Sequence, residues 1–227
     1  KGFDISAEFV NMYVGFGGQM FKPGTAQPAF NGEAGLKTIE LMKAMSKFMT
    51  PNFLASNSDD VMNQFQQGKA AMGVLWASRA ARMDDPAASK IVGKMEFAAA
   101  PAAVKGGKSA THLWWDGVAM PKNLANDRDT VFQVLMDGLS DSTVSSGNDL
   151  TIWIRSNYKP TRFGTGVTLS AKAGAPIWPT EPYLGLATNE IGKLVPEALG
   201  GAMTPQQALD AAAANYVKAA TEKGFIK

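Results

Sequence analysis

The sequence contains no cysteine and only one histidine. Without cysteine the chain forms no disulfide framework, no thiolate metal site and no cysteine nucleophile. The single histidine, His112, excludes metal sites built from several histidines. A Ser-His-Asp triad would depend on this one residue, and the Gly-x-Ser-x-Gly motif that would supply its serine is missing. We therefore expect no catalytic residue and no metal.

An excess of one charge and long apolar runs are lacking as well. The chain carries 22 Lys and Arg against 20 Asp and Glu, a net charge of +2, with no basic block, so no nucleic-acid partner is expected. No apolar stretch approaches the roughly 18 to 20 residues of a membrane helix. The glycine-rich stretch at 15–21 has neither the spacing of a dinucleotide fingerprint nor a P-loop lysine, so we expect no cofactor.

What is present is the composition of a globular protein: 227 residues of which 45% are hydrophobic, enough for one large or two small domains. Apolar residues recur at helical spacing in six stretches. The predicted helices are 5–16, 31–49, a short helix from Ser58 that turns at Gly68, 127–140, about 180–198, and 205–222.

Capping residues mark two of these helices. Thr204, Pro205 and Gln207 form the start of a capping box, and Gly224 is expected to close the same helix. Asn31 is a candidate cap for the helix over 31–49. That helix carries an apolar stripe, interpreted as core with a methionine-lined groove as the alternative: Leu41, Met42, Met45, Phe48 and Met49.

Three stretches have the composition of strands. They are 70–76, 94–102 and 112–120, of which the last two end close to a proline. Strands that alternate with helices indicate an α/β fold with mainly parallel pairing, because parallel strands need helical crossovers.

Aromatic residues beside polar ones recur where these strands are expected to end. Trp76 precedes Ser78 and Arg79, Trp114 and Trp115 precede Asp116, and Trp153 precedes Arg155. An indole covers the C–H face of a sugar or polyol, while carboxylate and guanidinium groups bond its hydroxyls in fixed directions. The pattern therefore favours a polyhydroxylated ligand.

Side-chain alternation divides the Trp114–Trp115 pair. In a strand the two indoles point to opposite faces, so Trp114 and Asp116 would line a cleft while Trp115 packs in the core, or the reverse. A third interpretation has both tryptophans packing between layers of the fold.

The chain resembles the family 1 extracellular solute-binding proteins of ABC importers, which include maltose-, trehalose- and polyol-binding proteins. The resemblance is carried first by "FQQGKAAMGVLWAS". Upstream of it "FVNMYVGFGGQMF" also resembles the family, and downstream so do "WWDGVAMPKNLANDRDTVFQVLMDGLS", "NYKPTR" and "GGAMTPQQALDAAAANY". These segments occur in the family's order over nearly the whole chain.

The resemblance implies a type II-like periplasmic-binding-protein fold of the α/β class and a function without catalysis. It implies a sugar or polyol bound between two lobes that close on a hinge, ABC permease subunits as partners, a monomer, and a periplasmic location, or an extracellular membrane-anchored one. Trp76 would stack on the ligand, Trp114, Trp115 and Asp116 would form the cleft segment near the hinge, and Arg162 would donate hydrogen bonds to it.

The segments that carry the resemblance belong to the C-terminal part of that family. We expect residues 1–110 to form an α/β segment of the C-terminal lobe, 111–148 a strand and helix that cross at the hinge, and 149–227 the helical end of the lobe. The chain begins without an initiator methionine, so we expect a processed or truncated protein. Two alternatives remain at this point: a carbohydrate-active hydrolase that uses Asp116, or a structural domain whose tryptophans only pack.

Overall fold

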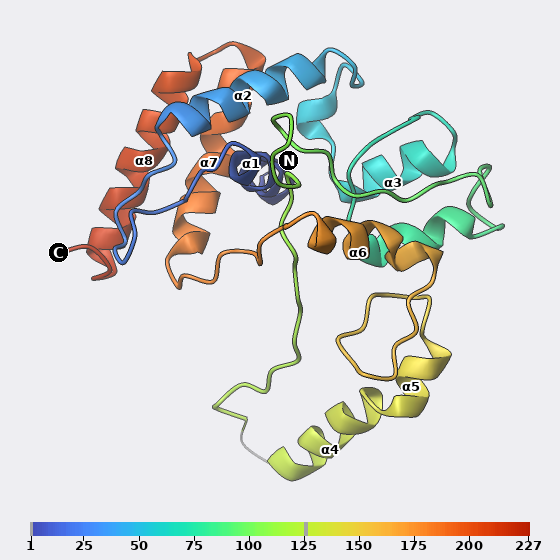
Figure 1. Cartoon of the computed structure of the whole chain (residues 1–227). Helices are drawn as coiled ribbons and strands as arrows, with labels where there is room; N and C mark the ends of the chain where they lie inside the picture. The colour runs from blue at the N-terminus through green and yellow to red at the C-terminus, as the bar shows by residue number, and fades with distance from the viewer. Residues whose placement is uncertain (1, 125–126) are drawn as a thin grey trace. The chain divides into compact units, whose positions relative to one another are not determined.

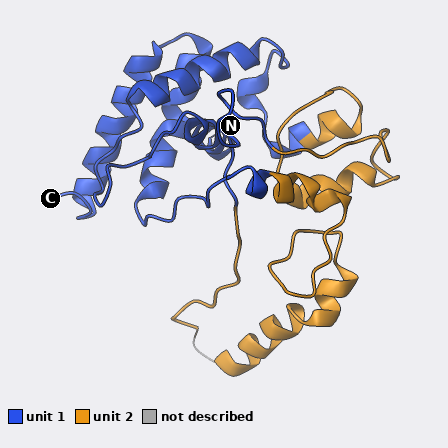
Figure 2. Cartoon of the chain, in the orientation of Figure 1, with its two compact units in different colours: residues 1–61, 100–113, 170–227 blue, residues 62–99, 114–169 orange. Residues whose placement is uncertain are grey.

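The computed structural model describes residues 2–124 and 127–227, which form two compact units (Figure 2). Unit 1 comprises residues up to 61 together with 100–113 and 170–227, and unit 2 comprises 62–99 and 114–169. Residues 1, 125 and 126, which fall in the predicted segments 1–110 and 111–148, lie outside the described residues.

Among the described residues, every secondary-structure element longer than an isolated bridge is a helix (Figure 1). Unit 1 contains α1 (Phe3–Gly15), α2 (Glu33–Ser46), the 3-10 helix η1 (Phe53–Ala55), α7 (Leu184–Gly200) and α8 (Pro205–Glu222). Unit 2 contains η2 (Ala77–Asp84), α4 (Arg128–Gly138), α5 (Asp141–Ser146) and η3 (Arg162–Gly164). The helices α3 (Ser58–Gln66) and α6 (Thr165–Lys172) have residues in both units.

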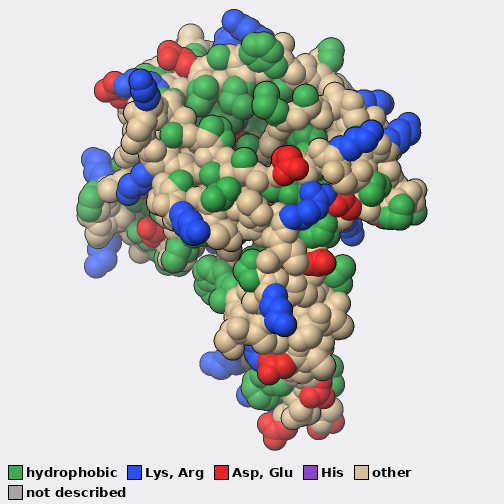
Figure 3. Space-filling view, turned by 45° about the vertical axis from the view of Figure 1, so that its right-hand side comes forward, with side chains coloured by type: hydrophobic (Ala, Val, Ile, Leu, Met, Phe, Trp, Pro, Cys, Tyr) green, Lys and Arg blue, Asp and Glu red, His purple; other side chains and the backbone are tan. Residues whose placement is uncertain are grey.

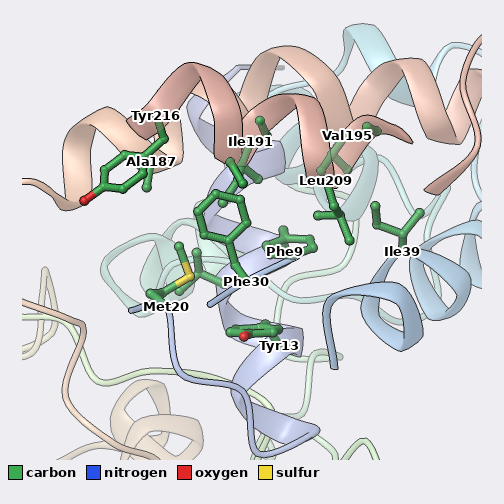
Figure 4. Packing of buried hydrophobic residues seen from close by; sticks show 14 of the residues in the cluster. Phe9, Tyr13, Met20, Phe30, Ile39, Ala187, Ile191, Val195, Leu209 and Tyr216 are labelled. Atoms are coloured by element: carbon green, nitrogen blue, oxygen red, sulfur yellow. The ribbon is translucent and has the colours of Figure 1, made fainter. Parts of the chain in front are cut away.

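The core of unit 1 lies between α1, α2, α7 and α8 (Figure 4). Phe9, Ile39, Ile191 and Leu209 point into it from these four helices, and each is fully buried. Phe30, from the loop before α2, is fully buried among them. Alanines on the inner side of α8 let α7 approach it closely, and Tyr216 fills the space between them and the loop that carries Ala26.

The capping signals of α8 are confirmed. The Thr204 hydroxyl accepts from the Gln207 backbone N–H at 3.2 Å, and the Gln207 side chain accepts from the Thr204 N–H at 3.0 Å. Pro205 begins the helix, and Gly224 follows its end with φ of 77°. The helix therefore begins and ends where local chemistry predicted.

The end of α1 depends on two glycines. Gly17 adopts φ of 75°, a left-handed conformation that glycine tolerates without strain. At Gly18 the chain runs against the ring of Tyr13, and a Cβ there would lie only 2.3 Å from a ring carbon. The helix predicted over 5–16 thus ends at Gly15, close to its predicted end, and the close approach explains why position 18 holds no side chain.

Two predictions for α2 are wrong. Asn31 does not cap the helix, because Gly32 occupies the cap position and the Asn31 amide donates to Asp210 on α8 at 2.9 Å. The apolar stripe is buried only in part: Met42 is in the core, but Phe48 is 92% exposed because the helix ends at Ser46. The predicted stripe extends beyond the end of the helix, and Thr38 and Ile39 complete the buried face instead.

The three predicted strands are absent from the described residues. Only isolated bridges form: Phe21 with Pro28, Ala102 with Ser109, and Leu113 with Ile177. The stretch 70–76, expected to be a buried strand, exposes 90% of Met72. A strand is stable when its backbone N–H and C=O groups meet a neighbouring strand, and apolar composition alone supplies no such neighbour.

The core of unit 2 is small. Met62, Phe65, Ala80, Met83 and Val144 are buried, and the Gln66 amide donates to the Arg82 carbonyl at 2.8 Å. Hydrophobic side chains also lie at the surface of the molecule (Figure 3). In unit 2 they include Phe132 and Val134 on α4, the helix predicted over 127–140, which buries none of its residues. No described helix has both the length and the apolarity to cross a membrane.

We expect the hydroxyl of Tyr216 to be a strong contributor to stability. It donates to the Ala26 carbonyl at 2.7 Å from a fully buried side chain. Tyr216→Phe leaves that carbonyl without its donor and should lower the free energy of unfolding by about 1 to 3 kcal/mol, measured by urea denaturation.

A matched control is available next to it. Tyr183 donates to the neighbouring Thr25 carbonyl at 3.0 Å in an exposed bond, so Tyr183→Phe should cost less than about 0.5 kcal/mol. Equal losses for both variants would show that burial of the Tyr216 bond is not what gives it its strength.

Candidate functional site

Two of the predicted ligand-binding residues meet in unit 2. The rings of Trp76 and Trp114 lie edge to face, with centroids 4.9 Å apart and planes at 90°. Trp76 caps the start of η2, and Trp114 is the first residue of the second part of unit 2. Edge-to-face contact places the positive edge of one indole on the negative face of the other, which favours this arrangement of the two rings by about 0.5 to 1.5 kcal/mol.

The next two predicted residues are at the surface. Trp115 is 61% exposed and Asp116 is exposed. Trp115 therefore does not pack in a core, and packing of both tryptophans between layers does not occur in this structure. Trp114 is half-buried and Trp115 exposed, but the strand from which their alternation was predicted does not form, so which of the two faces a ligand stays a prediction.

Arg162 makes a separate set of contacts in unit 2. Its guanidinium forms an ion pair with Asp84, and Nη1 donates to the Met95 carbonyl at 2.7 Å. The guanidinium carbon lies 5.5 Å from the ring centroid of Phe97 and 5.0 Å from that of Phe163, which is the range of cation–π contacts. Its predicted bond to a ligand stays a prediction, and two of its nitrogens already have partners.

The Asp84 carboxylate responds to these neighbours. Burial alone would raise its pKa, but the hydrogen bonds from Arg162 and from the Gly93 N–H, together with the charge of Arg162, hold the pKa below its ordinary value. The Gly93 N–H lies 2.8 Å from Oδ1, while Arg162 contacts Oδ2. Asp84 is therefore a carboxylate with both oxygens occupied.

Sequence reasoning missed Asp84, Phe97 and Phe163. Asp84 was visible only as half of an Asp-Asp pair, and it lies 78 residues from the arginine that it binds. The aromatic residues carry no local motif. The sequence offers one signal for them, because Phe163 directly follows Arg162. An aromatic residue next to an arginine is too common in sequences to identify a contact.

The single histidine has a structural position in unit 1. His112 is 8% exposed, its ring Nδ1 lies 3.2 Å from Asn11 Oδ1, and its backbone N–H donates to the same oxygen at 3.1 Å. Trp178 packs against its ring edge to face at 5.3 Å. Burial lowers the pKa of His112 to about 4, so the imidazole is neutral near pH 7.

A second titratable group of unit 1 is Glu8 on α1. Burial, and after it the negative charge of Asp4 one turn earlier, together raise its pKa to about 7. Asp4 itself accepts a hydrogen bond from the Ser58 hydroxyl. Over residues 2–124 and 127–227, no group of three or more His, Asp or Glu side chains has the geometry of a metal site.

Comparisons with known proteins give structural matches only. No protein-family model matches the chain, and no curated protein matches it. An ABC transporter solute-binding protein from Agrobacterium radiobacter K84, in complex with ribitol, matches with a TM-score of 0.72 and 22% identity over 96% of this chain. One from Agrobacterium vitis S4 with bound D-mannitol matches with a TM-score of 0.73 and 18% identity over 96% of this chain.

A solute-binding protein from Thermotoga lettingae, bound with α-D-tagatose, matches with a TM-score of 0.67 and 18% identity over 94% of this chain. The chain spans 57%, 58% and 56% of these three structures, respectively. The likeness confirms the predicted fold, that of periplasmic solute-binding proteins of the type II-like α/β class, and agrees with a C-terminal portion of it. The bridge of Leu113 to Ile177 is the one parallel pairing among the described residues of this chain.

The raised pKa of Glu8 predicts a pH-dependent stability. Between its ordinary pKa of 4.5 and about 7, the folded chain holds a proton on Glu8 that the unfolded chain releases, so stability falls as pH rises through this window. Glu8→Gln removes the ionisable group and should raise the free energy of unfolding by roughly 1 to 3 kcal/mol at about pH 8.

The internal control is the same variant near pH 4.5, where Glu8 is largely protonated in the folded state and the gain should be much smaller. His112 acts with the opposite sign, because its lowered pKa makes stability rise with pH between about 4 and 6.5. The difference between variant and parent therefore has to be compared, since the parent curve alone sums both effects. A gain independent of pH would contradict the assignment to Glu8.

Proposed function

We propose that the chain is the C-terminal part of the substrate-binding component of an ABC importer and that its ligand is a sugar or polyol. The observation that carries the proposal is the edge-to-face pair of Trp76 and Trp114 in a chain with the fold of solute-binding proteins bound to ribitol and D-mannitol. Indole faces match the C–H faces of such ligands. The function we propose is binding without catalysis, by a monomer in the periplasm or at the outer face of a cell, with ABC permease subunits as partners.

The side chains divide the work of binding. Trp76 would offer an indole face for stacking, beside its edge-to-face contact with Trp114. Asp116 is exposed and would accept hydrogen bonds from ligand hydroxyls, and Trp115, also exposed, would cover a second face of the ligand. In this proposal the ligand lies between this lobe and a second one, and closure of the two lobes is a shift between open and closed populations.

We also propose that 111–148 crosses at the hinge to the second lobe. Support comes from α4, which buries no residue and exposes 51% of Phe132 and 40% of Met136, two apolar side chains that lie one turn apart on the same face. A helix with an apolar face gains most of its stability from packing that face against a partner. A second lobe, from the part of the matched structures that this chain does not span, would be that partner.

We expect ribitol, D-mannitol or D-tagatose to bind in a saturable way to a two-lobed protein that contains this chain. Trp76→Ala should weaken this binding by roughly 1 to 3 kcal/mol, because the ligand loses the stacking surface of the indole. Isothermal titration calorimetry measures both affinities without using the removed tryptophan as a probe. Phe48→Ala, which removes an aromatic that is 92% exposed in unit 1, is the control and should leave the affinity unchanged.

Two results would contradict this function. One is the absence of binding for every compound tested in a two-lobed protein that contains this chain. The other is turnover of a glycoside that Asp116→Asn abolishes, since that would make the protein a hydrolase.

The crossing of 111–148 has its own test. Phe132→Ser should lower the free energy of unfolding of a two-lobed protein that contains this chain by about 2 kcal/mol, because the ring would be buried there. The same substitution should leave the 227-residue chain nearly unchanged, since the ring is 51% exposed in it. Ile154→Ser, at an exposed position outside 111–148, is the control, and equal effects of the two substitutions would contradict the crossing.

A further inference from the structure

We propose that Arg162 is a positioning residue: by holding Asp84 at the end of η2, it fixes Trp76 at the start of η2 in the orientation that receives the ligand. This inference rests on the function proposed above. It assigns to Arg162 an action through protein contacts instead of a bond to the ligand, and it assigns to Asp84 a part in ligand binding without contact.

The segment between the two residues is one in need of an anchor. Ala77–Asp84 forms a 3-10 helix of 8 residues, whereas runs of this helix longer than three or four residues are uncommon because its hydrogen bonds are poorly aligned. Only Ala80 and Met83 of η2 are buried. Backbone geometry and core packing therefore hold η2 only in part, and the Gln66 amide adds one bond to it, at the Arg82 carbonyl.

Arg162 supplies the anchor from three directions. Its ion pair with Asp84 holds the last residue of η2, and its bond of 2.7 Å to the Met95 carbonyl ties the pair to the following loop. Phe97 and Phe163 lie at 5.5 and 5.0 Å from the guanidinium carbon and restrict its movement. A planar guanidinium with fixed donors transmits orientation in a way that a flexible lysine does not.

The other end of η2 carries the indole. Trp76 is the cap residue, and its carbonyl accepts the first bond of the helix from the Arg79 N–H at 2.9 Å. Its ring then meets Trp114 edge to face at 4.9 Å. A displacement of η2 at Asp84 would therefore move the Trp76 ring at the other end of this short helix. That movement would change the contact between the Trp76 and Trp114 rings.

Unit 2 also offers a matched control. Arg155 Nη2 pairs with Asp141 Oδ1 at 2.7 Å, but the side chains are 45% and 74% exposed, against 37% and 22% for Arg162 and Asp84. Exposed ion pairs contribute little to structure. Arg155→Gln removes the same type of charge from the same unit without touching η2.

The experiment is a double-mutant cycle on Arg162→Gln and Asp84→Asn, with two readouts. The first is the near-ultraviolet circular dichroism of the ligand-free chain, in which Trp114→Phe identifies the signal of the indole pair. The second is the dissociation constant for ribitol and D-mannitol in a two-lobed protein that contains the chain. Asp84→Asn keeps the size of the side chain and remains informative if Arg162→Gln fails to fold.

We expect each single variant to reduce the signal of the indole pair and to weaken binding about tenfold, with the double variant no weaker than either single one, because both remove the same anchor. Arg155→Gln should change neither readout. Loss of binding in Arg162→Gln alone, with an unchanged indole signal, would show a direct bond to the ligand and overturn the proposal. A lower melting temperature with both readouts unchanged would also overturn it.

The spectra separate this proposal from the proposed function. If no ligand binds but both variants change the indole signal, the positioning of Trp76 by Arg162 stands and the sugar-binding function fails. If a ligand binds and neither variant changes the indole signal, the function stands and the positioning fails.

Discussion

Burial of the inner faces of α1, α7 and α8 against one another is the interaction on which unit 1 depends. Its close packing follows from composition: Ala187, Ala208, Ala212 and Ala220 are fully buried and bring the helix backbones together, while Tyr216 fills the remaining space. Dense packing of this kind rigidifies the elements that it includes. The loop that ends at Leu113 is held in this unit by two contacts. The His112 N–H donates to the Asn11 side chain, and Leu113 forms a bridge with Ile177.

The helices of this core were predictable because their signals are local. The Thr204 capping box lies within four residues, and the periodicity of α8 is complete within the helix itself. The strands were not predictable in the same way, because Met72 and its neighbours have an apolar composition that is equally compatible with an extended segment lacking a partner. Whether such a segment becomes a strand depends on whether residues far along the chain pair with it. A local sequence pattern does not predict that pairing.

The candidate site divides along the same line. The sequence predicted a type of chemistry, since Trp76 comes two residues before Ser78 and Trp114 two residues before Asp116. The pairing of Trp76 with Trp114 was not, because no pattern relates two residues 38 positions apart. The resemblance predicted a functional role for Arg162, and only the structure gave it Asp84, Met95 and Phe97 as partners.

The difference between the two cores has a consequence for the ligand binding that we propose for unit 2. Its core is small, so it cannot hold an aromatic wall by burial in the way that unit 1 holds Tyr216. A wall that is free to move must be ordered when the ligand arrives, which costs about 0.5 to 1.5 kcal/mol for each side chain that becomes fixed. Contacts that orient Trp76 in advance remove that cost from the binding step. In the positioning that we propose, a guanidinium bound to a carboxylate, a carbonyl and two aromatic rings adds to the order that this small core supplies.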